Sequence, residues 1–213
     1  MNDRATPRPA ALAFLLLLAT LASAGCQRAD GEQGAPIAGG EQHGTPLAGS
    51  SVGGPFALID QDGRRVRDTD FNGRYRLIYF GFANCPDVCP VDLQVMGAGL
   101  KQFEKSDPGR AARIQPIFIT VDPARDTPPV LKSYVANFHP RLIGLTGSAQ
   151  EIAAAQKEFA IFSEKGEARP DGGYNVNHMR IIYLMGPGGE PIALVPEDQG
   201  PQAVAAELDR WVQ

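Results

Sequence analysis

The chain has 213 residues, of which 43% are apolar and 21% charged, and it carries a formal net charge of -4. These values suit one globular domain with appended segments. The mild acidity and the lack of any Lys or Arg run argue against nucleic acid as a partner.

The N-terminal segment resembles a secretory signal of the lipoprotein type. Arg4 and Arg8 precede an apolar run from Ala10 to Leu21, which is too short for a comfortable transmembrane span. The tetrapeptide that ends at Cys26 resembles a bacterial lipobox, in which the cysteine is lipidated. We therefore predict a signal peptide over residues 1–25 and a lipidated Cys26. The protein would then be anchored to the cell membrane on its periplasmic, extracytoplasmic side. The alternatives are an uncleaved anchor or ordinary cleavage.

A low-complexity segment separates this signal from the expected domain. Residues 26–52 are rich in Gly, Ala, Gln and Glu and are predicted to form a flexible tether, with the folded domain over 53–213. If Cys26 carries lipid, Cys85 and Cys89 remain as a pair in an oxidising compartment, where dithiols tend to become disulfides.

Strands and helices alternate along the predicted domain. Strands are expected at Pro55–Ile59, Arg64–Val66, Tyr75–Phe82, Ile114–Val121, Leu142–Gly144, Met179–Met185 and Ile192–Val195. Helices are expected from Cys89 or Pro90 to Lys105 and at Pro129–Phe138, Ser148–Phe159 and Pro201–Val212. The order predicts an α/β fold in which helices flank a central mixed sheet, with an N-terminal β-hairpin. Between the helix that ends at Phe159 and the strand that begins at Met179, residues Ser163–Asn177 are expected to form a polar loop.

The stretch Gly81–Pro90 carries the chemistry, because two thiols lie where a strand gives way to a helix. Pro90 belongs in a first helical turn, which places Cys89 at the helix N-terminus and Cys85 in the preceding loop. The positive end of the helix favours thiolates there. A dithiol after the first long strand fits the thioredoxin arrangement.

The spacing of the thiols differs from the Cys-X-X-Cys of thioredoxins, because three residues separate them here. A wider loop can let both sulfurs converge on one soft ion, and thiolates select Cu(I). A structural disulfide is the plain alternative, although so short a loop constrains the unfolded chain weakly. Two sulfurs leave a trigonal site one ligand short.

His178 is the best candidate for the third ligand, since it ends the polar loop and precedes a strand. His139, at a helix end, reads as a surface histidine. Met179 carries a soft thioether, but strand alternation points it away from the side of His178, and it is expected to pack in the core.

Four segments together resemble the Sco/SenC family: Phe56–Gly63, Phe80–Pro90, Ile119–Thr127 and Tyr174–His178. The resemblance implies a thioredoxin-like fold, copper bound by Cys85, Cys89 and His178, and delivery of copper to the binuclear copper A centre of cytochrome c oxidase. The chain departs from the family at Asn177, where aspartate is usual, and at Met179, where serine or threonine is usual. The lost carboxylate removes one partner for the imidazole.

Three acidic residues lie around the expected site. Asp87 lies between the thiols, and Asp122 and Asp126 follow a strand end at what should be the same sheet edge. Arg125 can pair with a carboxylate, and Asp126 also reads as a residue at a helix start. We expect Asp122 or Asp126 near the copper site, in partner docking rather than ligation.

Two functions follow from these residues. The leading hypothesis is a membrane-tethered chaperone that carries Cu(I), with Cu(II) as a second state, to subunit II of cytochrome c oxidase or another copper-accepting protein. The alternative is a thiol-disulfide oxidoreductase that uses Cys85 and Cys89 to reduce the acceptor's cysteines; a peroxiredoxin-like peroxidase is a weaker third reading. A periplasmic copper donor, a thiol reductant and a monomeric state are also expected.

Overall fold

A computed structural model of the protein describes residues 44–168 and 173–213. The predicted signal peptide, the lipidated Cys26 and most of the predicted tether lie outside the described residues.

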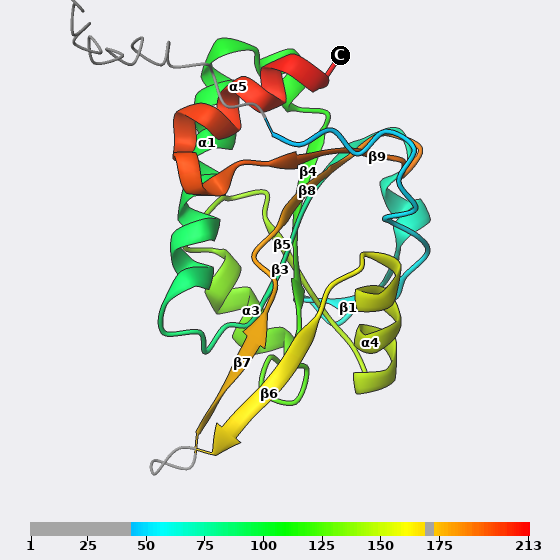
Figure 1. The fold of residues 1–213 in the computed structure, drawn as a ribbon, viewed down its shortest axis with the longest axis vertical. Helices are drawn as coiled ribbons and strands as arrows, with labels where there is room; N and C mark the ends of the chain where they lie inside the picture. Colours follow the sequence, from blue (N-terminus) through cyan, green and yellow to red (C-terminus); the bar gives the residue numbers. More distant parts are fainter. Residues whose placement is uncertain (1–43, 169–172) are drawn as a thin grey trace, which may run out of the picture. The chain divides into compact units, whose positions relative to one another are not determined.

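The core of the domain is a mixed seven-stranded sheet with the strand order β2-β1-β5-β4-β3-β8-β9. Its strands are β1 (Ala57–Asp60), β2 (Arg65–Arg67), β3 (Tyr75–Gly81), β4 (Ile114–Thr120), β5 (Ile143–Thr146), β8 (Ile182–Met185) and β9 (Pro191–Val195). β3, β4 and β5 run parallel, while β1 and β8 are antiparallel to their neighbours in this group. β1 also pairs with β2 and β8 with β9 as antiparallel hairpins (Figure 1). The predicted central mixed sheet is confirmed.

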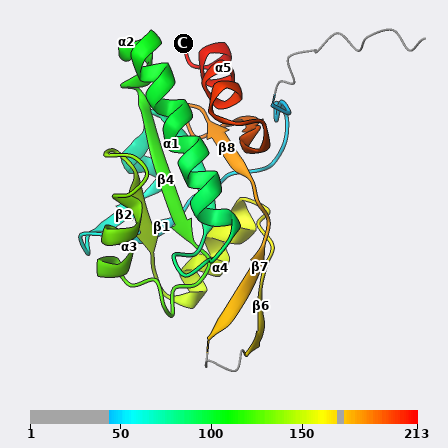
Figure 2. The ribbon, with the colours of Figure 1, turned by 90° about the vertical axis from the view of Figure 1, so that its left-hand side faces the viewer.

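Helices cover both faces of this sheet. The α-helices are α1 (Val88–Ser106), α2 (Pro108–Ala111), α3 (Pro128–Val135), α4 (Ala149–Glu158) and α5 (Pro201–Trp211), with 3-10 turns at Asp68–Phe71 and Glu197–Gln199. α1, α3 and α5 lie in front of the sheet in Figure 2, and α4 lies behind it. The crossovers through α1 and α3 lead in the same direction across the sheet, so both helices pack on the same face.

The two central strands explain why the sheet is the core. Every residue of β3 is buried, and in β4 only Gln115 is partly exposed. Strands buried on both faces read as continuous apolar runs, which is why the sequence predicts them well. The parallel pairing of β3 with β4 brings their carboxyl ends, Gly81 and Thr120, to one edge of the sheet.

The region before the last hairpin differs from the prediction. Residues expected to form a polar loop form a separate two-stranded antiparallel sheet, β6 (Ser163–Ala168) with β7 (Tyr174–His178). Its residues are mostly polar because both faces are largely exposed, and only Val176 is buried. β8 also begins later than predicted, at Ile182, so Met179 lies outside any strand.

The start of the described chain also differs from the prediction. The predicted tether extends to residue 52, yet Thr45 and Leu47 form backbone hydrogen bonds with Leu194 and Ile192 of β9. A carboxylate oxygen of the buried Glu207 accepts from the Gly44 amide at 3.1 Å. The folded part therefore includes residues expected in the tether. Within the part of the chain that the structure describes, no helix has the length and apolar character needed to cross a bilayer.

Candidate metal centre

The structure brings one thiol and one imidazole into contact from distant parts of the chain. Cys89, in the first turn of α1, places its Sγ 3.1 Å from Nε2 of His178, the last residue of β7. The helix can approach the sheet here because Gly81 has no side chain: a Cβ at Gly81 would lie 3.1 Å from the Cys89 sulfur and 2.8 Å from the Tyr79 ring.

The other ring nitrogen of His178 is held by the backbone. Nδ1 lies 2.9 Å from the carbonyl oxygen of Met179, which can only accept a hydrogen bond, so Nδ1 carries the proton. Nε2 is left facing Cys89. Ligating histidines commonly donate their second N–H to a carboxylate or a carbonyl. The Met179 carbonyl thus serves as the partner of the imidazole in place of the carboxylate that is lost at Asn177.

Two aromatic rings fix the plane of this imidazole. The rings of Tyr79 and Phe82 meet it edge to face, with centroid distances of 6.2 and 5.9 Å and interplanar angles of 83° and 86°. Such contacts favour one ring orientation over rotation about the side-chain bonds.

The two thiols have opposite electrostatic surroundings. The hydrogen bond from Cys89 lowers the pKa of the Cys85 thiol to about 3, although burial opposes this shift. The same hydrogen bond, together with burial, raises the pKa of Cys89. Cys85 is partly exposed, whereas Cys89 is fully buried. The site therefore pairs an accessible thiolate with a protected thiol, and no disulfide joins them.

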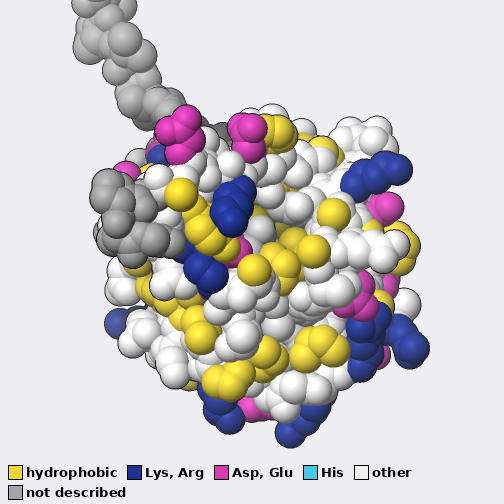
Figure 3. All heavy atoms as spheres, turned by 90° about the horizontal axis from the view of Figure 1, so that it is seen from below, with side chains coloured by type: hydrophobic (Ala, Val, Ile, Leu, Met, Phe, Trp, Pro, Cys, Tyr) yellow, Lys and Arg dark blue, Asp and Glu magenta, His cyan; other side chains and the backbone are white. Residues whose placement is uncertain are grey.

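A surface hollow of about 310 Å³ opens beside Cys85. Its lining comes from the dithiol loop on one side and from β7 and the segment after it on the other, and includes Asp87, Asn177, His178 and Arg180. Asp87, which lies between the two thiols in the sequence, is exposed there. Figure 3 views the domain from the end where β6 and β7 project, and hydrophobic side chains spread across that face between groups of charged ones.

Sequence reasoning missed a buried polar cluster behind the imidazole. Asp92 of α1 is 1% exposed and accepts a hydrogen bond from the Tyr79 hydroxyl at 2.9 Å. It also pairs with Arg180 through two contacts, Nε to Oδ2 at 3.0 Å and Nη2 to Oδ1 at 2.6 Å. Burial raises the pKa of Tyr79, so its hydroxyl stays protonated and donates. The signal available in the sequence was a carboxylate on the helix face that carries Cys89 and Leu93.

The predicted acidic residues after β4, Asp122 and Asp126, anchor the two segments that carry the site residues. Asp122 binds Arg125 Nε and accepts from the Tyr174 hydroxyl at 2.9 Å, while the Arg125 guanidinium lies 3.7 Å from the Tyr174 ring centroid. This cluster attaches β7 to the main domain. Asp126 accepts from the Ala83 amide at 2.9 Å and thereby holds the dithiol loop. Because Asp126 is 0% exposed, its side chain is not available to a docking partner.

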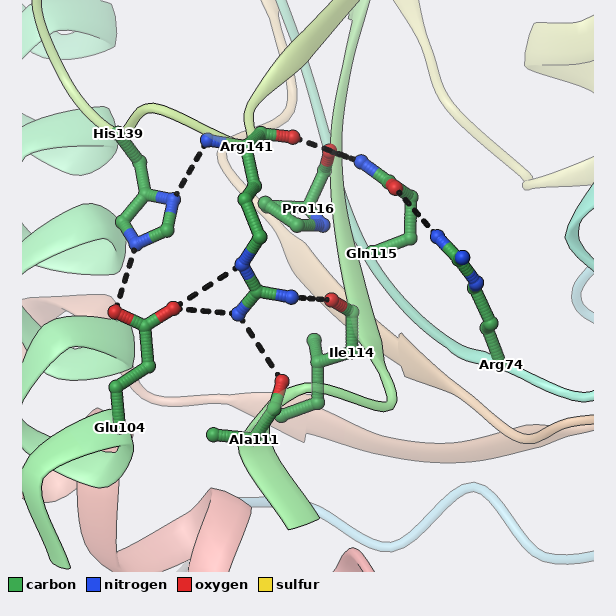
Figure 4. A network of polar contacts seen from close by, with 8 residues as sticks. All are labelled: Arg74, Glu104, Ala111, Ile114, Gln115, Pro116, His139 and Arg141. Atoms are coloured by element: carbon green, nitrogen blue, oxygen red, sulfur yellow. Dashed lines mark hydrogen bonds and ion pairs between the residues drawn. The ribbon is translucent and has the colours of Figure 1, made fainter. Parts of the chain in front are cut away.

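Two further expectations about single residues were wrong. His139, expected on the surface, is 2% exposed; it accepts from the Arg141 amide and lies 3.4 Å from Glu104 (Figure 4). Met179, expected in the core, is 39% exposed. The prediction fails because β7 ends at His178, so strand alternation does not extend to Met179. The Met179 sulfur accepts from the Phe162 amide at 3.4 Å.

The donor set suits a soft metal ion but is closed in this conformation. Thiolate and imidazole ligands lie about 2.0–2.3 Å from a metal, so the ligands around one ion are farther apart than the 3.1 Å between Cys89 and His178. Consistent with this, within residues 44–168 and 173–213 no three His, Cys, Asp or Glu side chains have the arrangement of a metal cluster. An ion would have to separate the pair slightly.

The fold and the site together define a thioredoxin-like domain in which a dithiol faces a histidine from a distant strand. A thioredoxin domain of a thiol-disulfide oxidoreductase from Bacteroides vulgatus shares the fold, with a TM-score of 0.54 at 16% identity over 76% of this chain and 96% of that one.

The SCO1/SenC family model matches residues 44–213, and the chain belongs to this family. It is 40% identical over 190 residues to the mitochondrial SCO2 homolog of Bos taurus, covering 86% of this chain and 69% of that protein. It is 44% identical over 136 residues to the SCO2 homolog of Danio rerio, covering 64% of this chain and only 48% of the relative.

Solved structures of the family include copper-bound forms. ScoI of Bradyrhizobium japonicum with copper bound is 38% identical, with a TM-score of 0.68 over 75% of this chain and 99% of that one. Yeast Sco1 with copper bound is 36% identical, with a TM-score of 0.69 over 76% and 88%. BsSco, described as a member of the Sco family of cytochrome c oxidase assembly proteins and as containing a disulfide switch, is 27% identical, with a TM-score of 0.53 over 80% and 99%.

Proposed function

We propose that this protein is a copper chaperone in which Cys85, Cys89 and His178 bind Cu(I) and release it to the binuclear copper A centre of cytochrome c oxidase. The observation that carries the proposal is the 3.1 Å contact between the Cys89 sulfur and the His178 imidazole, which lie 89 residues apart in the chain. Thiolates and imidazole are the ligands that Cu(I) prefers. Copper-bound relatives of the same fold support the assignment.

The setting of the chaperone is part of the same proposal. A signal peptide over residues 1–25, lipid on Cys26 and a short tether would hold the domain at the periplasmic side of the membrane. The cargo would pass to subunit II of the oxidase or to another copper-accepting protein. A periplasmic copper donor and a thiol reductant would load the site, and the protein would act as a monomer.

Copper binding tests the ligand set directly. The reduced protein is expected to bind one Cu(I) per chain in competition with a chromogenic chelator, and Cys85→Ala, Cys89→Ala and His178→Ala should each weaken binding strongly. The substitution His139→Asn is a matched control, because His139 lies beside Glu104 near the end of α1, whereas Cys89 lies at its start. Unchanged affinity in His178→Ala would refute the three-ligand site.

The asymmetry of the thiols favours a second candidate, reduction of an acceptor disulfide. The Cys85 thiolate would attack one acceptor sulfur and expel the other as a thiolate. Cys89 would then lose its proton and attack the Cys85 sulfur, which frees the second acceptor thiol and leaves a disulfide in this protein. This activity needs both cysteines but not His178, so His178→Ala separates the two functions: it should lose copper affinity and keep disulfide turnover.

A further inference from the structure

We propose that Arg180 is a positioning residue that, through its ion pair with Asp92, holds His178 against the dithiol; this rests on the proposed copper ligands. The pair joins the two parts of the chain that must meet. Asp92 lies three residues after Cys89 and Arg180 two residues after His178. The Asp92–Arg180 brace, as we call this pair, therefore spans the same gap as the ligands themselves.

The geometry of the brace restricts both partners. Arg180 binds both carboxylate oxygens, at 3.0 and 2.6 Å, and a two-point contact with a planar guanidinium fixes orientation as well as distance. Asp92 is 1% exposed, so releasing Arg180 would leave a buried carboxylate without its ion pair, which is costly. The remaining partner of the carboxylate, the Tyr79 hydroxyl, belongs to the ring that meets the imidazole edge to face.

The histidine needs such a support because its strand is not part of the main sheet. In the described residues β7 pairs only with β6, and the segment from Met179 to Ile181 lies between strands. β7 is attached near its start, where Tyr174 contacts Asp122 and Arg125. The brace supplies the attachment at its other end, where the imidazole must be placed.

A double-mutant cycle on Cu(I) affinity tests the brace. Arg180→Met is expected to weaken Cu(I) binding by the reduced protein roughly 10- to 100-fold, the usual effect of losing a residue that orients a ligand. In a His178→Ala background the same substitution should change affinity by no more than about twofold, because there is no imidazole left to position. Arg74→Met is the matched control: this exposed arginine precedes β3, at the end of the strand away from the dithiol, where it donates to the Gln115 side chain, and its loss should have no effect.

A second substitution separates position from charge. Arg180→Lys keeps the positive charge near the site but cannot make the two-point contact. If the brace acts by positioning, the lysine variant should bind Cu(I) nearly as weakly as Arg180→Met. Full affinity in Arg180→Lys would show that charge alone matters and would overturn the proposal.

A copper-free measurement completes the test. Nitrogen-15 chemical shifts of the His178 ring should report a single Nδ1–H tautomer in the native apo protein and an averaged ring in Arg180→Met. Asp92→Asn should behave like Arg180→Met, and circular dichroism confirms that each variant is folded.

The outcomes are distinguishable. If His178→Ala leaves Cu(I) affinity unchanged, the proposed ligand set fails and the brace with it. If His178→Ala weakens binding but Arg180→Met does not, or weakens it equally in both backgrounds, the brace alone is refuted.

Discussion

Cys85 and Cys89 lie four positions apart, yet their thiols differ in chemistry because Cys85 is partly exposed to solvent and Cys89 is buried. Cys89 donates to Cys85, which stabilises the Cys85 thiolate and keeps the Cys89 proton in place. Thiolate is both the nucleophile and the metal ligand, so an incoming group should meet Cys85 first. Copper entry and disulfide attack would then share one first step.

Selective alkylation tests this order. Limited iodoacetamide at about pH 6, where an ordinary thiol reacts slowly, should label Cys85 of the reduced, copper-free protein and spare Cys89. Cys89→Ala should slow the labelling, because Cys85 then loses the hydrogen bond that favours its thiolate. Peptide mass spectrometry reads out the site. Equal labelling of the two cysteines, or an unchanged rate in Cys89→Ala, would contradict the assignment.

Single residues differ in how far the sequence predicts them. The dithiol and His178 stand out because thiols beside a strand end and a histidine after a polar segment are chemically distinctive. Asp92 and Arg180 do not stand out, since a carboxylate in a helix and an arginine before a strand usually face water. Their pairing depends on how α1 lies against the segment after β7, which is a tertiary property.

At the scale of elements, α1 carries the site and must lie close to its neighbours. Glycine weakens a helix interior, yet α1 contains two glycines, Gly97 and Gly99. The structure gives them a packing role: a Cβ at Gly97 would lie 2.7 Å from the Phe138 carbonyl oxygen, and one at Gly99 would lie 2.5 Å from Val204 of α5. The small side chains allow the close approach that fixes the position of α1.

Substitution of Gly99 tests this packing. Gly99→Ala should lower the free energy of unfolding by about 1–3 kcal/mol because of overcrowding, although alanine is intrinsically the better helix former by about 1 kcal/mol. Gly109→Ala in α2 is the control, because its Cβ would meet only an Asp107 oxygen at 3.5 Å. Urea unfolding measures both, and a stabilised Gly99→Ala would contradict the packing argument.

The β6–β7 hairpin shows where element prediction fails. Period-two alternation of apolar and polar residues is the usual signal for a strand, and it arises when one face of the strand is buried. β6 has no buried residue and β7 has one, Val176, so neither carries the signal. The hairpin is held by the Tyr174 cluster and by the brace, which involve residues far away in sequence.

At the scale of the whole molecule, a second polar network lies at the other end of the parallel strands. Arg141 donates to the carbonyls of Ala111 and Ile114 and binds Glu104, which also contacts His139 (Figure 4). The network joins α1, α2, β4 and the connection into β5. Its role is structural, since the dithiol lies at the opposite ends of these strands.

The pH dependence of global stability tests this network. Burial lowers the pKa of His139 below its ordinary value of 6.5, although Glu104 opposes the shift. The unfolded chain therefore binds a proton more readily than the folded one, and stability should fall as the pH drops through 6.5 towards the lower folded value. In His139→Asn, urea midpoints should fall less between about pH 7.5 and pH 5.5 than in the native protein. Parallel pH profiles for the two proteins would refute the assignment.

The sequence by itself determines the mixed sheet and its helices, because buried central strands read as continuous apolar runs and amphipathic helices have a local periodic pattern. It also determines the candidate ligands, because the dithiol, its position before a helix and the distant histidine are properties of composition and order. Only the tertiary structure decides that β7 turns back to place His178 at Cys89, that a backbone carbonyl orients the imidazole, and that Asp92 and Arg180 brace it. These contacts join residues distant in sequence, and no local pattern specifies which of them meet.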